Sequence, residues 1–218
     1  MTFDPYSGHL WEQENGDDSF SEINRVEPGF NSGWTQIMGP ASRVAQFRAI
    51  ETDRRTGIDP NAPNGYYGLQ QIRWLPENIA TNTEDALERL FRLPGSRFSD
   101  PEMAWKYEVA PGGITFLKGD GLGHRYDGDF FVGSARAALV SGNLFRLEVE
   151  RNRREFDLDD RRLRDRVADN TFKYDVTESE SLLFGENFGV TPDVESSPDE
   201  TLFVVSLSRN TVYEIAQR

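Results

Sequence analysis

One pattern recurs three times along this 218-residue chain: a turn, an apolar strand, a polar stretch and then an alternating strand. The copies span residues 3–26, 114–149 and 197–215, and β-branched and aromatic residues dominate their strands. A unit of this kind cannot bury its apolar face alone and stacks on its neighbours. The sequence therefore predicts an all-β fold built from about three such units, of the kind that make up a β-propeller.

The second copy shows the pattern most clearly. Residues 144–149 alternate with a period of two, and residues 114–117 and 130–132 form apolar runs around the turn signal Tyr-Asp-Gly. In the first copy, the alternation of Ile23 and Val26 is imperfect. We expect one partial propeller domain over residues 1–218.

Two stretches interrupt the repeats and are expected to be surface insertions. Residues 41–104 are mostly irregular, with one helix predicted to begin at a cap residue, Asn82 or Thr83, and to end before Pro94. Residues 151–192 carry a mixed-charge run and then an acidic run. Within them, residues 159–167 are expected to form a short helix, and the rest a solvated loop.

Charge and composition exclude several classes of function. The chain has 37 acidic and 24 basic residues, a net charge of −13 that repels phosphate backbones and anionic lipids. Nucleic acid and membrane surfaces are therefore not expected partners. The absence of cysteine excludes disulfides, thiolate metal sites and a cysteine nucleophile. The first residues have neither a basic nor an apolar segment, and no window approaches the ~20 apolar residues of a membrane span, so we expect neither a signal peptide nor a span in this chain.

The densest cluster of oxygen donors lies in residues 14–22. Hard cations such as calcium take six to eight oxygen ligands, from carboxylates and loop carbonyls alike. The spacing is not that of an EF-hand, and a solvated acidic turn is the alternative interpretation. The carboxylates in this stretch are Glu14, Asp17, Asp18 and Glu22.

Three other polar residues are candidates for chemistry. His9 and His124 have no acid or serine context that suggests a catalytic base, and both are expected at the surface. Arg136 follows the apolar run of the second copy. It is expected either to form a surface ion pair or to point into a propeller channel and hold an anionic ligand with a planar two-point contact.

Several short motifs occur in a consistent order along the chain. Residues 14–16, 21–24 and 29–34 read Glu-Asn-Gly, Ser-Glu-Ile-Asn and Gly-Phe-Asn-Ser-Gly-Trp. Residues 110–114 read Ala-Pro-Gly-Gly-Ile, and residues 129–134 read Asp-Phe-Phe-Val-Gly-Ser. Asp-Val at 193–194 and Ser-Pro-Asp at 197–199 precede the closing strand. Together these stretches resemble the C-terminal part of the pyrroloquinoline-quinone (PQQ) dependent glucose/sorbosone dehydrogenases, six-bladed propellers that oxidise aldoses with PQQ and calcium.

The resemblance implies roles for four residues. Backbone carbonyls of Gly16 and Asp17 match those that hold the calcium ion bridging to PQQ, although the family usually has proline in place of Asp17. Glu22 matches a ligand of a separate structural calcium pair, whose tyrosine partner is replaced here by Ser32. Arg136 stands where the family has a lysine that contacts the quinone.

Two departures from the family separate this chain from a complete catalyst. The Arg-x-Arg-Asp-Val element that grips the PQQ carboxylates reads Val-Thr-Pro-Asp-Val at 190–194. Each missing charge-assisted hydrogen bond removes about 1.5–3 kcal/mol of binding. The resemblance also begins about halfway along the family's length, so the blades that bear its catalytic base histidine are expected to lie outside this chain.

Two functional hypotheses follow. The first is a partial quinoprotein sugar dehydrogenase that, when complete, transfers a hydride from an aldose to PQQ with calcium, in the periplasm or outside the cell as the family implies. The second is a non-catalytic propeller that has lost the cofactor site and binds carbohydrate or protein. In both, an open propeller exposes apolar faces and strand edges, so we also expect self-association.

Overall fold

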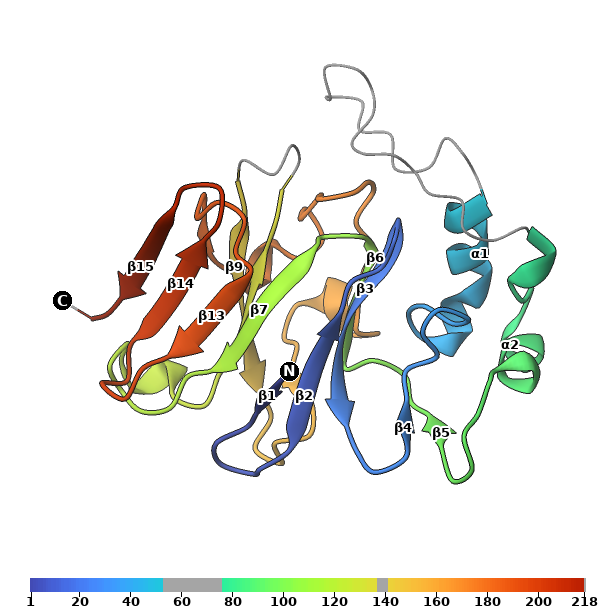
Figure 1. The fold of residues 1–218 in the computed structure, drawn as a ribbon, viewed down its shortest axis with the longest axis horizontal. Helices are drawn as coiled ribbons and strands as arrows, with labels where there is room; N and C mark the ends of the chain where they lie inside the picture. The colour runs from blue at the N-terminus through green and yellow to red at the C-terminus, as the bar shows by residue number, and fades with distance from the viewer. Residues whose placement is uncertain (53–75, 137–140, 218) are drawn as a thin grey trace, which may run out of the picture.

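The computed structural model describes residues 1–52, 76–136 and 141–217, and most of their regular structure is β-strand. Three main sheets stand side by side, with two short α-helices at one end of the row (Figure 1). The all-β class is therefore confirmed, and each of the three sequence repeats supplies strands to a different sheet. Closure into a propeller remains a prediction.

The first sheet is built around the hairpin of the first repeat. Two strands from outside the repeats complete it, and the last of them pairs in parallel. Its strand order is β1 (Thr2–Phe3), β2 (Leu10–Glu14), β3 (Ser19–Val26), β6 (Met103–Tyr107) and β11 (Val167–Ala168).

The second sheet is an antiparallel meander from the second repeat. Its order is β10 (Phe156–Asp157), β9 (Asn143–Val149), β8 (Phe130–Ser134) and β7 (Pro111–Phe116), and β12 (Leu183–Glu186) also pairs with β9. The third sheet comprises β13 (Asp193–Ser196), β14 (Leu202–Ser206) and β15 (Thr211–Ile215). A parallel pair, β4 (Phe30–Asn31) and β5 (Arg97–Phe98), lies beside the first sheet.

Apolar side chains fill the spaces between neighbouring layers. Between the first and second sheets, Trp11 packs its ring against Phe116, Phe130 and Phe156, with ring centroids 4.9–6.0 Å apart. A second cluster, which includes Val194, joins the second and third sheets. Alternation with a period of two explains this packing, because it gives each strand an apolar side facing the next layer.

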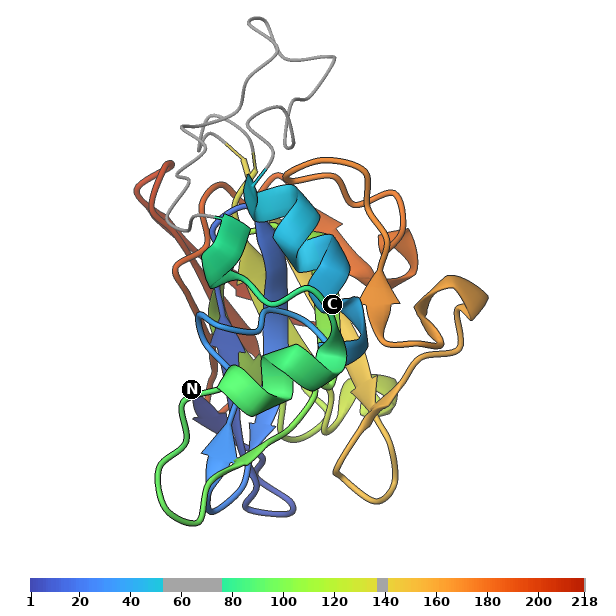
Figure 2. The same cartoon turned by 90° about the vertical axis from the view of Figure 1, so that its right-hand side faces the viewer.

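Helices cover the free face of the first sheet, as Figure 2 shows. α2 (Thr83–Arg89) begins after the Asn82 cap, whose side chain accepts a hydrogen bond from the Asp85 amide, so the predicted helix is confirmed. α1 (Val44–Thr52) was not predicted, although Val44, Phe47 and Ile50 are spaced to face one side. The short 3-10 helices are η1 (Ala41–Arg43), η2 (Pro76–Asn78), η3 (His124–Tyr126), η5 (Arg161–Leu163) and η6 (Glu180–Leu182).

The stretches expected to be insertions contribute more to the core than their sequences suggest. Strands β10, β11 and β12 come from residues 151–192. The short helix expected over residues 159–167 is wrong in extent: only the 3-10 turn η5 forms, and Val167 lies in β11, although Leu163 and Val167 are both fully buried. The remainder differs from a solvated loop, since Asn170 and Ser179 are fully buried. Residues 53–75, part of the other stretch, lie outside the described residues. In the portion that the structure describes, no helix combines the length and apolar character needed to cross a membrane.

Candidate functional site

The turn between β2 and β3 holds the predicted calcium ligands Gly16 and Asp17. A side chain at Gly16 would place its Cβ 1.9 Å from the Ser19 carbonyl oxygen, so only glycine fits this turn. Asp18, the next residue in the turn, is 1% exposed. The turn is therefore a packed structure and not a solvated acidic loop.

A lysine from a distant segment reaches into this turn. The Lys173 ammonium lies 2.8 Å from the Asp17 carbonyl oxygen and 3.0 Å from a Glu108 carboxylate oxygen, and it forms an ion pair with Asp18. Lys173 is 7% exposed. Burial lowers its pKa, but Glu108 and Asp18 raise that pKa by more, so it lies above its usual value and the ammonium stays charged.

Helix α1 supplies a further carboxylate to the same turn. Glu51 accepts hydrogen bonds from the Asp18 and Ser19 amides and from the Ser19 hydroxyl, at 2.7–3.2 Å. Oxygens of Asp17, Asp18 and Glu51 all lie within 4.8 Å of one another. Burial, partly offset by the Ser19 hydrogen bond, raises the pKa of Glu51 to about 7. We call Asp17, Asp18, Glu51 and Glu108 the acidic cluster.

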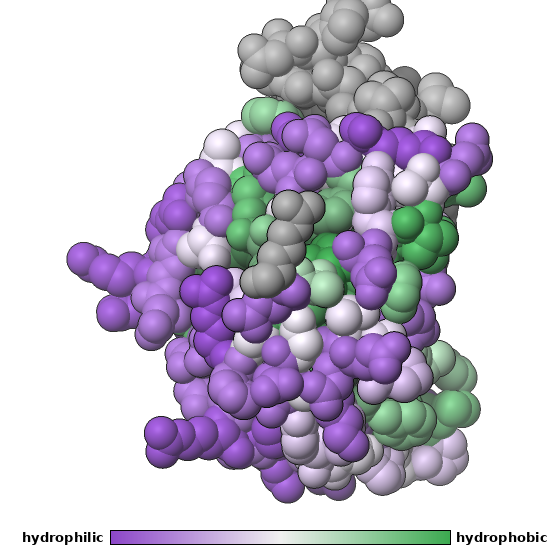
Figure 3. All heavy atoms as spheres, turned by 90° about the vertical axis from the view of Figure 1, so that its left-hand side faces the viewer, coloured by the Kyte–Doolittle hydropathy of each residue, from purple (hydrophilic) through white to green (hydrophobic). Residues whose placement is uncertain are grey.

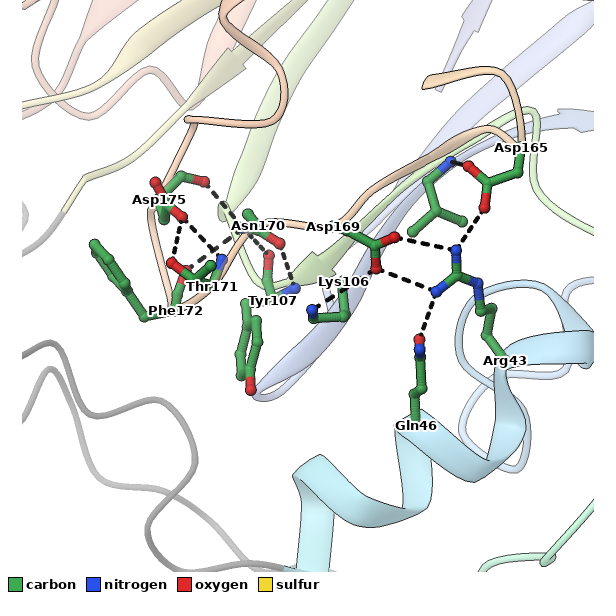
Figure 4. Close-up of polar contacts among 11 residues, drawn as sticks. Arg43, Gln46, Lys106, Tyr107, Asp165, Asp169, Asn170, Thr171, Phe172 and Asp175 are labelled. Atoms are coloured by element: carbon green, nitrogen blue, oxygen red, sulfur yellow. Dashed lines mark hydrogen bonds and ion pairs between the residues drawn. The ribbon is translucent and has the colours of Figure 1, made fainter. Parts of the chain in front are cut away.

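The loop that carries Lys173 is fixed to the first sheet before it reaches the cluster. Asn170 exchanges hydrogen bonds of 2.8 and 2.9 Å with the Tyr107 backbone and donates another, of 2.9 Å, to the Asp175 carbonyl (Figure 4). The Asp175 carboxylate accepts from the Thr171 amide and hydroxyl. On the helix side, Arg43 pairs with Asp165 and Asp169 of the same segment (Figure 4).

Glu22 lies in the middle of β3, on the face of the first sheet that packs against the helices. It is fully buried, and its two carboxylate oxygens accept hydrogen bonds from the Gly39 amide and the Asn24 side chain. Burial, reinforced by the neighbouring charge of Glu14, raises the pKa of Glu22 to about 8. Ser32, at the position where the family has a tyrosine, donates a 2.7 Å hydrogen bond to Glu14.

Arg136 lies two residues beyond the end of β8, a strand of the second sheet. The β2–β3 turn and this end of β8 both lie at the upper edge of the molecule in Figure 1. The Arg136 guanidinium forms a 3.7 Å ion pair with Glu186, and its side chain is 40% exposed. Thr191, within the stretch where the family has its arginines, is buried and donates a 2.8 Å hydrogen bond to the Ser134 carbonyl.

The turn also borders a small surface pocket that was not predicted. Its lining includes Asn15, Asp17, Trp34 and Glu51. Trp34 is 49% exposed, so part of its indole surface is available beside polar hydrogen-bonding groups. The two histidines lie elsewhere: His9 contacts the Arg153 carbonyl at 2.9 Å, and the His124 side chain is 91% exposed.

The residues at the turn do not fit a calcium ion as the resemblance implies. The Asp17 carbonyl that would serve as a ligand already accepts a hydrogen bond from the Lys173 ammonium, which also pairs with the Asp18 carboxylate. Both Glu22 oxygens are likewise used by protein donors. The sequence does not point to Lys173, Glu108 and Glu51, because they lie far from the turn along the chain. The one local signal was the group Asn170, Thr171 and Asp175 around Lys173, because such residues are typical of ordered turns.

Two solved structures are similar to the chain along most of its length. An oxidoreductase described as a glucose dehydrogenase, from Thermus thermophilus, is 19% identical, with a TM-score of 0.48 over 96% of this chain and 39% of its own. A second glucose dehydrogenase is 19% identical, with a TM-score of 0.49 over 99% of this chain and 43% of its own. The chain thus spans about two fifths of the length of these structures. No protein-family model matches the chain, and no curated protein matches it.

Proposed function

We propose that the chain is part of a β-propeller of the sugar-oxidoreductase kind, and that its cofactor chemistry is the one implied by the resemblance to PQQ-dependent glucose/sorbosone dehydrogenases. One observation carries the proposal: motifs far apart in sequence meet where the second and third sheets touch. A Cβ on Gly113 would lie 2.3 Å from the Asp193 Cα, and one on Gly133 would lie 2.5 Å from the Thr191 hydroxyl oxygen. The motif glycines thus permit the close approach of neighbouring sheets that a propeller needs.

In this proposal the whole propeller oxidises an aldose by hydride transfer to PQQ, and this chain supplies scaffold and one ligand contact. Arg136 is the residue assigned to the quinone, because its guanidinium can bind a carboxylate of PQQ through two parallel hydrogen bonds. Its present partner, Glu186, is half exposed and 3.7 Å away, a weak contact that an anionic ligand can displace. We assign no catalytic residue to the chain, and no step through calcium.

A second function, a carbohydrate-binding platform without a cofactor, is favoured by the pocket beside Trp34. A sugar ring presents apolar C–H groups on its face and hydroxyls at its edge. The exposed part of Trp34 can stack on the face, while Asn15 and Glu51 can bind hydroxyls. This arrangement needs neither PQQ nor a metal ion.

PQQ binding separates the two functions. We expect the native chain to bind PQQ in a fluorescence titration, and Arg136→Ala to weaken binding tenfold or more, because one charge-assisted contact is worth about 1.5–3 kcal/mol. Arg209→Ala, at an exposed arginine outside the site, should bind like the native chain. Equal affinity in all three proteins would exclude Arg136 as the quinone contact.

The alternative is tested on the same proteins with aldoses and without PQQ. A platform predicts that aldoses change the fluorescence of the native chain and that Trp34→Ala abolishes binding, whereas Phe3→Ala, at another exposed aromatic residue, does not. Sugar binding without any PQQ binding would leave the platform as the function. Absence of both would overturn both proposals.

A further inference from the structure

We infer that the Lys173 ammonium is the permanent cation of the acidic cluster, held where a metal ion would otherwise neutralise it, so that the folded turn does not depend on calcium. This inference rests on the geometry of the cluster and not on the proposed function. It assigns to Lys173 the role of a positioning residue, because it acts by holding the turn.

The ammonium is surrounded by oxygens in the way a bound cation is. It contacts the Asp17 carbonyl at 2.8 Å, Glu108 at 3.0 Å, and Asp18 through an ion pair. An ammonium group has three N–H donors, and these three oxygens match them in number. A cation that is buried is stable only when such partners replace its water.

Lys173 joins three segments that are distant in sequence. The Glu108 amide donates to the Asp18 carbonyl at 3.2 Å, and the Tyr174 amide donates to the Glu108 carbonyl at 2.8 Å. These backbone contacts bring the carboxylates of Asp18 and Glu108 together from the β2–β3 turn and from the link between β6 and β7. The ammonium between them offsets the repulsion that the two carboxylates would otherwise exert.

Hydrogen bonds fix the loop that carries Lys173, so the ammonium is held in position to contact the acidic cluster. Its neighbours Asn170 and Asp175 are both buried and each makes several hydrogen bonds to the backbone around them. Less conformational freedom is therefore lost when Lys173 reaches the cluster. A divalent ion on the same oxygens would be in direct repulsion with the ammonium, so the two cations exclude each other.

The test compares native chain, Lys173→Met and Lys118→Met by thermal melting in calcium and in EDTA. Lys173→Met keeps the length of the side chain and removes its charge, and Lys118 is an exposed lysine outside the cluster. We expect Lys173→Met to melt lower than the native chain in EDTA and to gain stability with calcium. The native chain and Lys118→Met should melt at the same temperature in both buffers.

Two results would overturn the inference. One is a Lys173→Met protein whose melting temperature does not rise with calcium by more than that of the native chain. The other comes from a second measurement, which is used if Lys173→Met does not fold in either buffer. Terbium luminescence is then measured on the native chain and on Asp18→Asn. Terbium binding that the Asp18→Asn change abolishes would show that a metal ion and Lys173 share the cluster, whereas no such binding supports exclusion by the ammonium.

Discussion

Glu22 illustrates how a residue that looks like a metal ligand in sequence becomes a buried carboxyl group with a raised pKa in the fold. It is fully buried, with a pKa raised to about 8, and the nearby Asn24 side-chain oxygen has no hydrogen-bond partner. The Asn24 amide nitrogen donates to one oxygen of Glu22, and the Gly39 amide donates to the other. Burial therefore favours the protonated, neutral form of the Glu22 carboxyl group.

The raised pKa predicts that stability falls as the pH rises. The folded state holds a proton on Glu22 that the unfolded chain releases above about 4.5, so the free energy of unfolding decreases between about pH 4.5 and 8. The expected slope from this group is on the order of 1 kcal/mol per pH unit. Glu22→Gln, which mimics the neutral acid, should flatten the slope in urea denaturation with EDTA present. Glu195→Gln, at an exposed position, should leave the slope unchanged, and an unaltered slope in Glu22→Gln would contradict the prediction.

At the scale of elements, the strand β6 and the loop after β11 form one unit. Asn170 is the link, because its side chain forms hydrogen bonds with the Tyr107 amide and carbonyl beyond the end of the β6–β11 ladder. Such side-chain bonds replace the backbone partners that an irregular segment lacks. The sheet edge and the loop carrying Lys173 are therefore expected to unfold together.

Asn170→Ala tests this link. It leaves the Tyr107 backbone without its side-chain partner, and we expect a loss of about 1–3 kcal/mol in the free energy of unfolding. Hydrogen exchange at the Tyr107 amide should accelerate. Asn152→Ala, at an exposed asparagine with a single backbone hydrogen bond, is the matched control and should cost less. Equal losses in the two variants would show that Asn170 does not hold the loop.

At the scale of the whole molecule, the two ends of the row of sheets differ. Helices cover the first sheet, whereas the outer face of the third sheet shows an apolar area in Figure 3. Phe203 and Val205 are half-buried there, and Val212 is 59% exposed. β15 is also an edge strand in this sheet. An apolar face beside an open edge favours association with a second copy.

We therefore expect the isolated chain to self-associate with rising concentration in sedimentation velocity. Val212→Lys, which places a charge on the open face, should shift the distribution toward monomer. Leu93→Lys, at a residue 65% exposed near the helical end, should not. A native chain that stays monomeric at every concentration would contradict this expectation.

Local sequence determined the strands of the three repeats and the capped helix α2. Their signals, alternation with a period of two and an asparagine cap, depend on neighbouring residues only. Helix α1 also has a local signal, the spacing of three between Val44, Phe47 and Ile50. It was not predicted because it lies in a stretch that is otherwise irregular.

Only the tertiary structure decided what surrounds each candidate ligand. Asp17 and Lys173 are 156 residues apart, yet their contact determines whether the turn has room for a metal ion. Burial and charge then raised the pKa of Glu22 to about 8, a value that no local pattern contains. The physical reason is that strand formation depends on near neighbours, whereas the charge state and the partners of an oxygen depend on every segment that packs around it.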